Sequence, residues 1–483
     1  MTRSPASDTD ALPVIEPELD QAAAAMDQAD APPARRPSLL RRVATSVDDP
    51  VLRILVTATL ISRLGRGVFL TVTVLYFTLI VGLSAHEIAI VLAASSGLGI
   101  FASLAGGWLA DRMSARRLLL AFTALEGLGL LGYALAGDFA SALVVGMAVG
   151  GFGQAANSTR VAIIARSFEG EPRVAARAVL RTVTNLAIAV GSGFGAIALA
   201  AGTAGAYRAL LVAAGVAYLL GLVVLVRLPR SVDARPALES PDETVHTETG
   251  SIDRLATKRA ARRSLAAHSP WRNPRYLGLT ALSAVFGMQF GVGEVGVPLW
   301  IANETAAPEV LLSALLILNT VIVVIFQVPL SRGTHDLRRA GRVSAIAAWL
   351  MAAACLVYAS AAGLPAAFAI AVIVIAASAH AFAEVLSQAG GWGLSFELAD
   401  PVRAGTYQGV FSMGYSVGAM CAPLLVTATA LTHGVAGWAI LAAVFLASGL
   451  GTWAIARSAA RTAGADRRPA RSVGDSGADS QPS

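Results

Sequence analysis

The sequence is poor in charged residues, has a single lysine and contains only two cysteines. Charged side chains make up 14% of its 483 residues, whereas soluble domains average roughly 25%. A chain this apolar cannot cover a soluble surface, so lipid must solvate much of it. Cys355 and Cys421 both lie inside apolar runs, so we expect two buried small hydrophobic side chains rather than a disulfide or a metal site.

Signatures of several other protein classes are also missing. There is no Gly-x-x-x-x-Gly-Lys-Ser/Thr phosphate loop and no His-Glu-x-x-His zinc motif. We therefore expect no enzyme, no cofactor and no use of ATP by this chain. The net charge of +6 does not indicate a nucleic-acid partner, because the arginines are concentrated between the apolar runs.

The N-terminal segment does not have the pattern of a secretory signal. Acidic residues come first and the first apolar run begins only after Arg53, whereas a signal peptide places basic residues first and its apolar run within about 30 residues. We predict that residues 1–50 and 458–483 are disordered cytoplasmic tails.

Twelve apolar runs have the length of a membrane-spanning helix, which needs ~20 mostly apolar residues. A polar, charged stretch at 229–275 divides them six and six, so the sequence predicts an all-α membrane protein with one bundle at 51–228 and a second at 276–457. The runs lie at about 52–81, 86–110, 115–136, 140–165, 177–201, 206–227, 276–301, 309–330, 343–362, 365–395, 405–431 and 434–456.

The arginines also predict the orientation in the membrane. If the N-terminus is cytoplasmic, the outside loops hold one basic residue, Arg208. Because loops on the cytoplasmic side carry the excess of Lys and Arg, we predict that both termini are cytoplasmic and that the chain lies in the cell membrane. The inside loops then hold the central stretch together with Arg112, Arg116, Arg117, Arg166, Arg173, Arg332, Arg338, Arg339, Arg342 and Arg403.

The two halves resemble each other in their small residues. The fifth run carries Ala187, Gly191 and Gly195, and the eleventh carries Gly414, Gly418 and Ala422, an offset of about 227 positions. Small residues spaced by four lie on one helix face and allow helices to approach closely. Together with the six-plus-six pattern, they predict two parallel repeats, a common transporter design.

A loop between the second and third runs carries a recognisable motif. Residues 107–117 read Gly-Trp-Leu-Ala-Asp-Arg-Met-Ser-Ala-Arg-Arg, and a looser copy at 336–342 reads Asp-Leu-Arg-Arg-Ala-Gly-Arg. The loop resembles the signature loop of the major facilitator superfamily, with Ser114 in place of the second glycine. The resemblance covers about 50–457 and implies a monomer of two six-helix bundles. It also implies a gating latch at Gly107, Asp111, Arg112 and Arg116; the alternative is a solvated basic loop.

The same resemblance bears on the direction of transport. In that superfamily the small-residue pattern of helix five is typical of exporters and usually ends in Gly-Pro. Here helix five ends in Gly195-Ala196, and the proline version is in helix eleven at Ala422-Pro423. The helix-four arginine often associated with proton antiport is not evident, because Arg160 lies nearer the cytoplasmic end. The resemblance therefore favours export.

Six ionisable residues inside the apolar runs are candidates for the substrate or proton pathway, because charge at bilayer depth usually faces a cavity or a partner. Arg63 and Arg66 share a helix face and predict a cationic patch suited to anionic groups, or else a structural ion pair. His380 and Glu384 also share a face and predict a proton site, or else a buried hydrogen-bonded pair. The remaining two are Glu126 and Glu294.

The leading hypothesis from the sequence is a proton-coupled exporter of small molecules, such as drugs or metabolites, that works by alternating access. Its partners would be the substrate, protons and the lipid bilayer. The first alternative is an importer or exchanger of an anionic metabolite, which Arg63 and Arg66 would favour. The second, from another class, is a membrane scaffold or sensor that transports nothing.

Overall fold

A computed structural model describes residues 49–199, 203–234 and 268–466, all of which belong to one compact unit. Most of the predicted tails and of the predicted central loop lie outside these residues. The described part of the chain is helical throughout and contains no strand. The predicted boundary at 457 differs from the structure, because the last helix continues to Asp466.

The helices follow the predicted apolar runs closely. The first group consists of α3 (Pro50–Tyr76) with the π-helical turn η1 (Phe77–Val81), α4 (Ala85–Ala110), α5 (Ala115–Tyr133), α6 (Phe139–Ser167), α7 (Gly170–Leu199) and α8 (Ala204–Leu225). Short helices η2 (Arg230–Asp233) and η3 (Pro270–Arg272) follow. The second group consists of α10 (Pro274–Gly287), α11 (Gln289–Gly291), η4 (Val292–Gly296), α12 (Val297–Glu304), α13 (Leu311–Ser331), α14 (Leu337–Ala359), α15 (Ala366–Glu397), η5 (Pro401–Arg403), α16 (Ala404–Val426), η6 (Thr427–Leu431) and α17 (Thr432–Asp466).

Ten helical segments of the described residues are long and apolar enough to cross a membrane. The last of these covers α16, η6 and α17, with a kink at Gly434 inside α17, and α5 is not among the ten. Phe101, Leu316 and Trp349 are each more than half exposed, as expected for side chains that face lipid. The structure is therefore that of an all-helical membrane protein, and the count of twelve spans stays a prediction.

Polar side chains cap the helices where they begin. Asp49 accepts hydrogen bonds from the N–H groups of Val51 and Leu52 at 2.8 and 3.0 Å, and Ser84 forms a capping box with Glu87. The first N–H groups of a helix have no partner within the helix, and hydrocarbon offers none. Such caps therefore mark the level at which each span leaves the apolar layer.

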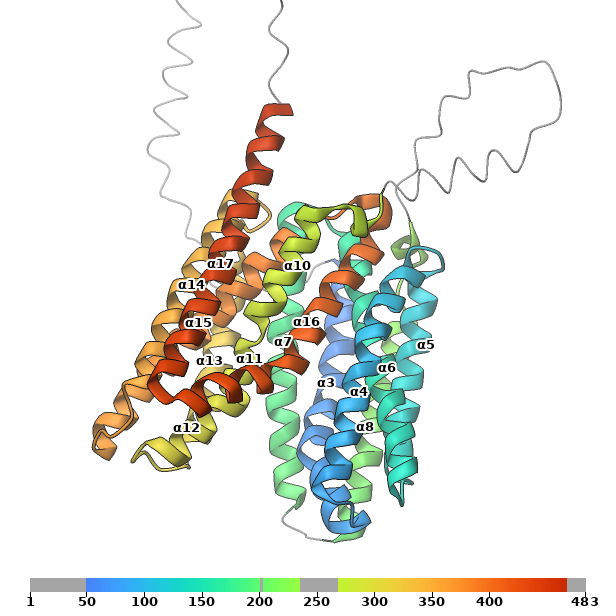
Figure 1. The fold of residues 1–483 in the computed structure, drawn as a ribbon. Helices are drawn as coiled ribbons and strands as arrows, with labels where there is room; N and C mark the ends of the chain where they lie inside the picture. Colours follow the sequence, from blue (N-terminus) through green and yellow to red (C-terminus); the bar gives the residue numbers. More distant parts are fainter. Residues whose placement is uncertain (1–48, 200–202, 235–267, 467–483) are drawn as a thin grey trace, which may run out of the picture. The chain divides into compact units, whose positions relative to one another are not determined.

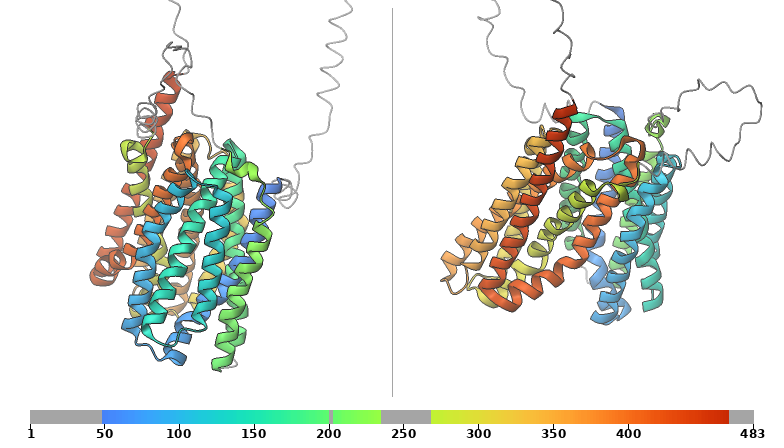
Figure 2. Two further views of the ribbon diagram at one scale, coloured as in Figure 1. Left: turned by 90° about the vertical axis from the view of Figure 1, so that its right-hand side faces the viewer. Right: turned by 45° about the horizontal axis from the view of Figure 1, so that its top comes forward.

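The helices form two bundles, α3–α8 and α10–α17, which lie side by side and diverge toward the lower end of Figure 1. Helix α4 packs against α16, α6 against α16 and α7 against α13, and these contacts join the bundles. We call the end at which α4 ends and α7 begins the Asp111 end. Figure 2 shows the same arrangement from two further directions.

Candidate functional site

Asp111 joins the two bundles at the C-terminal end of α4. Its carboxylate accepts hydrogen bonds from the N–H groups of Gly405 and Thr406 at 2.8 and 2.6 Å and from the Thr406 hydroxyl at 2.5 Å. It also pairs with Arg166 of α6 at 2.5 Å, and both side chains are about 5% exposed. The carboxylate thus satisfies the free N–H groups at the start of α16 and opposes the positive end of that helix.

Glycines allow α4 and α16 to approach at this point. A Cβ at Gly107 would collide with the carbonyl oxygen of Gly405 and lie 2.8 Å from Cα of Gly409. No side chain larger than hydrogen fits there without separating the helices. Gly107 therefore positions Asp111 against α16.

The hydrogen bonds and ring contact of the two arginines of the predicted latch lie within the first bundle. The Arg112 guanidinium stacks 3.8 Å from the ring centre of Trp108, and partial burial, followed by repulsion from Arg403, lowers its pKa. Arg116 donates to the carbonyl oxygens of Leu228 and Val226 at 2.7 and 2.6 Å. Arg116 therefore caps the C-terminal end of the α8 segment, and a gating role for these two residues stays a prediction.

Further contacts join the bundles beside Asp111. The Glu171 carboxylate accepts from the N–H of Gly333 at 2.7 Å and contacts Nδ1 of His335 at 2.8 Å. Because Glu171 opens α7 and the other two residues follow α13, this contact also ties the first bundle to the second.

Three arginines of α7, each one helical turn after the last, face α15. The outer one forms an ion pair, the middle one lies over an aromatic ring and the inner one, about 16 Å from the start of α7 at ~1.5 Å per residue, forms a second ion pair. We call this set the α7–α15 ladder: Arg173 with Glu397 (2.5 Å), Arg177 with Trp392 (guanidinium 4.1 Å from the ring centre) and Arg181 with Glu384.

Glu384 is the best-connected of the predicted acids. One carboxylate oxygen pairs with Arg181 and the other accepts from Nδ2 of Asn319 on α13 at 3.0 Å. The buried His380 and the exposed Glu294 both interact with Glu384 electrostatically. The structure thus brings His380, Glu384 and Glu294 together, but Glu294 lies in the π-helical turn η4 and is not part of the buried network.

A cavity of about 130 Å³ lies in the first bundle between α3, α6 and α7. Four arginines line it, and we call it the arginine cavity. Asn157, Asn185 and two threonines also line it. The lining residues are Thr59, Arg63, Asn157, Arg160, Val161, Ile164, Arg177, Leu180, Arg181, Thr184 and Asn185.

Glu126 lies beside this cavity and interacts electrostatically with Arg63, Arg160 and the Tyr218 phenol. It is 5% exposed, and Gly153 leaves room for its carboxylate, because a Cβ there would lie 2.8 Å from Oε1. Arg66 is not among the lining residues. Its guanidinium lies 5.1 Å from the ring centre of Phe69, although it shares a helix face with Arg63.

Sequence reasoning did not assign Arg160, Arg177 and Arg181 to one site. The sequence did indicate part of this arrangement. Arg173, Arg177 and Arg181 recur every four residues and so lie on one face of α7. The facing residues on α15 lie more than 200 positions away. Only the packing of the two bundles identifies them.

One Gly-x-Ser-x-Gly pattern occurs, at 414–418, and the fold gives it no nucleophilic role. It lies within α16 rather than at the strand-to-helix turn that a nucleophile elbow requires. Ser416 accepts from Nε2 of Gln154 and donates to the carbonyl oxygen of Ser412, both at 3.2 Å. Ser416 therefore braces α16 against α6.

Comparisons with known proteins agree with this architecture. Residues 55–423 match the family model of the Major Facilitator Superfamily, whereas no curated protein matches the sequence at a significant level. The human organic anion transporter MFSD10 (TETRAN) is similar in structure, with a TM-score of 0.61, 15% identity and coverage of 84% of this chain and 100% of that one.

Two further solved structures share the fold. The transporter FucP in its outward conformation gives a TM-score of 0.61 at 13% identity, covering 86% of this chain and 99% of that one. A mutant of the peptide transporter POT in complex with alafosfalin gives 0.57 at 17% identity, covering 85% and 95%. With the family match spanning most of the sequence, this chain belongs to the major facilitator superfamily and is a membrane transporter.

Proposed function

We propose that this protein is a secondary active transporter of small molecules that carry an anionic group, and that the arginine cavity binds this group. The observation that carries the proposal is that four arginines line one cavity of about 130 Å³. Glu126 and Glu384 balance only part of this charge. Uncompensated charge inside a protein is costly, so an anion that enters the cavity would be stabilised strongly.

The size and lining of the cavity suggest which part of a substrate it holds. Drug-sized ligands occupy pockets of roughly 300–1,000 Å³, whereas this cavity fits a single carboxylate, sulfonate or phosphate group. Guanidinium groups bind such oxyanions through paired N–H donors, and the amides of Asn157 and Asn185 add further donors. The rest of the substrate would extend toward the end at which the bundles diverge.

We further propose alternating access with the Asp111 end in the cytoplasm. This assignment rests on the arginine-rich loops at that end, and it makes both termini cytoplasmic, with α5 as a span despite Arg116, Arg117 and Glu126. The contacts of Asp111, Glu171 and the α7–α15 ladder all close this end. The structure would then represent the conformation closed to the cytoplasm. Labelling of single cysteines at positions 117 and 135 from outside intact cells tests this, and only position 135 should react.

Proton-coupled export is the second candidate, and the environment of Glu384 favours it. Its carboxylate holds Arg181 of the opposite bundle and Asn319 at once. Protonation would release Arg181 toward the arginine cavity, where a substrate anion could replace the carboxylate. Protons and substrate would thereby compete for one network, which is how antiport arises.

The test is an exchange assay with purified protein in liposomes. Aromatic carboxylates, dicarboxylates and phosphate monoesters are compared with lipophilic cations and neutral sugars. We expect exchange of one anion class, with affinity lowered about tenfold or more in Arg160→Gln and Arg177→Gln, because a hydrogen bond to a charged group contributes about 1.5–3 kcal/mol. The matched control is Arg53→Gln, at the exposed start of α3.

A second assay separates the two candidates. In inverted vesicles with a proton gradient and a pH-reporting dye, substrate-dependent proton release that is lost in Glu384→Gln would support antiport. Exchange of anions without proton movement would support the exchanger. Transport of cations or sugars alone, unaffected by the cavity variants, would contradict the anion proposal.

A further inference from the structure

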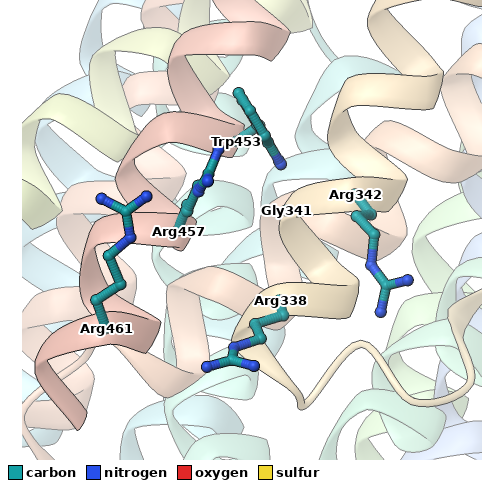
Figure 3. Close-up of a pocket in the computed structure, with 6 residues that line it drawn as sticks. All are labelled: Arg338, Gly341, Arg342, Trp453, Arg457 and Arg461. Atoms are coloured by element: carbon teal, nitrogen blue, oxygen red, sulfur yellow. The ribbon is translucent and has the colours of Figure 1, made fainter. Parts of the chain in front are cut away.

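A second basic region lies on the outer side of the second bundle, apart from the arginine cavity. A groove of about 490 Å³ runs between α14 and α17 at the Asp111 end. Arg338, Gly341 and Arg342 line it from α14 (Figure 3), and α17 contributes Trp453, Arg457 and Arg461. We call it the α14–α17 groove.

The four arginines of this groove are all exposed. Arg457 lies 5.3 Å from the ring centre of Trp453. Within the described part of the chain, no carboxylate forms an ion pair with any of the four. A concentration of positive charge without carboxylate partners is a site for an anionic ligand.

Gly341 forms the floor of the groove. A Cβ at this position would lie 2.7 Å from Cβ of Ala456 and 3.4 Å from Cδ1 of Trp453. Because glycine has no Cβ, α17 can approach α14 closely. The groove is therefore a narrow trough, flanked by the arginines at positions 338, 342, 457 and 461.

The groove is also the position of the second copy of the loop motif, at 336–342. Its aspartate does not repeat the role of Asp111. Oδ1 of Asp336 accepts from the N–H of Arg339 in its own helix at 2.7 Å, so it caps α14. Within the described residues, Arg338 and Arg342 form no ion pair with the opposite bundle.

The surroundings identify the ligand as a lipid rather than a soluble anion. Arg338, Arg342, Ile346 and Trp349 lie on one face of α14 by their spacing, and Ile346 and Trp349 are 51% and 60% exposed. Along this face, two arginines are followed by two exposed apolar side chains, which lipid hydrocarbon would cover. An amphipathic Trp453 at the junction is typical of the membrane interface.

We infer that the α14–α17 groove binds the phosphate headgroup of an anionic phospholipid in the leaflet at the Asp111 end, with its acyl chains along Ile346 and Trp349. α17 supports this depth, because the 32 residues that follow its kink at Gly434, 435–466, span about 48 Å at ~1.5 Å per residue. This exceeds the ~30 Å hydrocarbon thickness, so its last turns lie at headgroup level. Lipid binding at this groove does not depend on what the transporter carries.

The test uses the full chain in phosphatidylcholine nanodiscs that contain a graded fraction of phosphatidylglycerol with brominated acyl chains. Bromine quenches nearby tryptophan fluorescence, and subtraction of a Trp453→Phe variant isolates the signal of Trp453. We expect half-maximal quenching at a several-fold lower fraction for brominated phosphatidylglycerol than for brominated phosphatidylcholine. Arg338→Gln combined with Arg461→Gln should abolish this preference, because two losses of ~1 kcal/mol per basic residue correspond to roughly 30-fold, which exceeds it.

Matched variants distinguish the loss of this groove from a general loss of positive charge. Arg53→Gln combined with Arg117→Gln removes the same charge from the same end of the molecule and should leave the preference intact. Arg338→Lys combined with Arg461→Lys should retain most of it. Equal quenching by the two lipids, or equal loss in both glutamine pairs, would overturn the inference. Displacement of brominated phosphatidylglycerol by millimolar inorganic phosphate would overturn the lipid assignment.

Discussion

Replacing Asp111 by asparagine is expected to shift the protein away from the conformation described above. The carboxylate accepts three hydrogen bonds from Gly405 and Thr406, in the opposite bundle. Its ion pair with Arg166 lies within the first bundle and would persist if the bundles rocked apart. Only the contacts with α16 therefore bear on the conformational equilibrium.

The magnitude follows from those contacts. A helix N-cap contributes about 0.5–2 kcal/mol, and hydrogen bonds to a charged group about 1.5–3 kcal/mol each. An amide retains one acceptor oxygen, so we estimate a net loss of about 2.5 kcal/mol, or roughly 70-fold in the equilibrium. A conformation populated at about 1% would then rise to about 40%.

The assay measures a distance at the end remote from Asp111. Spin labels at Leu135 and Val310, which are 87% and 75% exposed, report on the first and second bundle respectively. Cys355 and Cys421 are replaced by alanine in this background. Asp111→Asn should add a population with a shorter distance, because that end closes when the Asp111 end opens.

The matched control is Asp336→Asn, in the second copy of the motif. Asp336 caps only its own helix, so this variant should lower stability by about 1 kcal/mol and leave the distances unchanged. An unaltered distance distribution in Asp111→Asn, or the same shift in both variants, would refute the reasoning.

Three further predictions concern stability and closure. Gly107→Ala should open the Asp111 end, seen as an added population with a shorter distance between the labels at positions 135 and 310, because its Cβ collides with Gly405. Arg116→Ala should lower the thermal midpoint by several degrees and leave the spin-label distances unchanged, because the two carbonyls that it caps belong to the first bundle. Tyr276→Phe should lower stability by about 1 kcal/mol, measured by denaturant or thermal unfolding in detergent, because its buried hydroxyl donates to the Tyr407 carbonyl at 2.9 Å.

The sequence predicted the helices well because hydrocarbon allows few alternatives. An apolar run of about 20 residues must satisfy its own backbone, and a helix does so. The same reasoning failed at α17, where the helix continues beyond 457 into a segment that composition marked as a tail. It also did not foresee the π-helical turn η4 at Val292–Gly296.

The candidate site was predictable only in part. Asp111 was identified from its loop, and Glu384 from its depth, since each signal is local. The partners of Arg177 and Arg181 were not, because contacts between bundles depend on how two helices far apart in sequence are rotated against each other. Arg63 and Arg66 illustrate the limit, since one borders a cavity and the other lies over Phe69 despite their shared face.

The regular spacing of the three arginines in the α7–α15 ladder has a mechanical consequence. Its three arginines are one turn apart, and successive partners on α15 accept a guanidinium in each case, by charge or by an aromatic face. A slide of α7 by one turn, about 5.4 Å, would bring Arg177 level with Glu384 and Arg173 level with Trp392. After such a slide, Arg177 and Arg173 would each contact a new partner on α15. Relative motion of the two bundles therefore need not leave all three arginines without a partner at the same time.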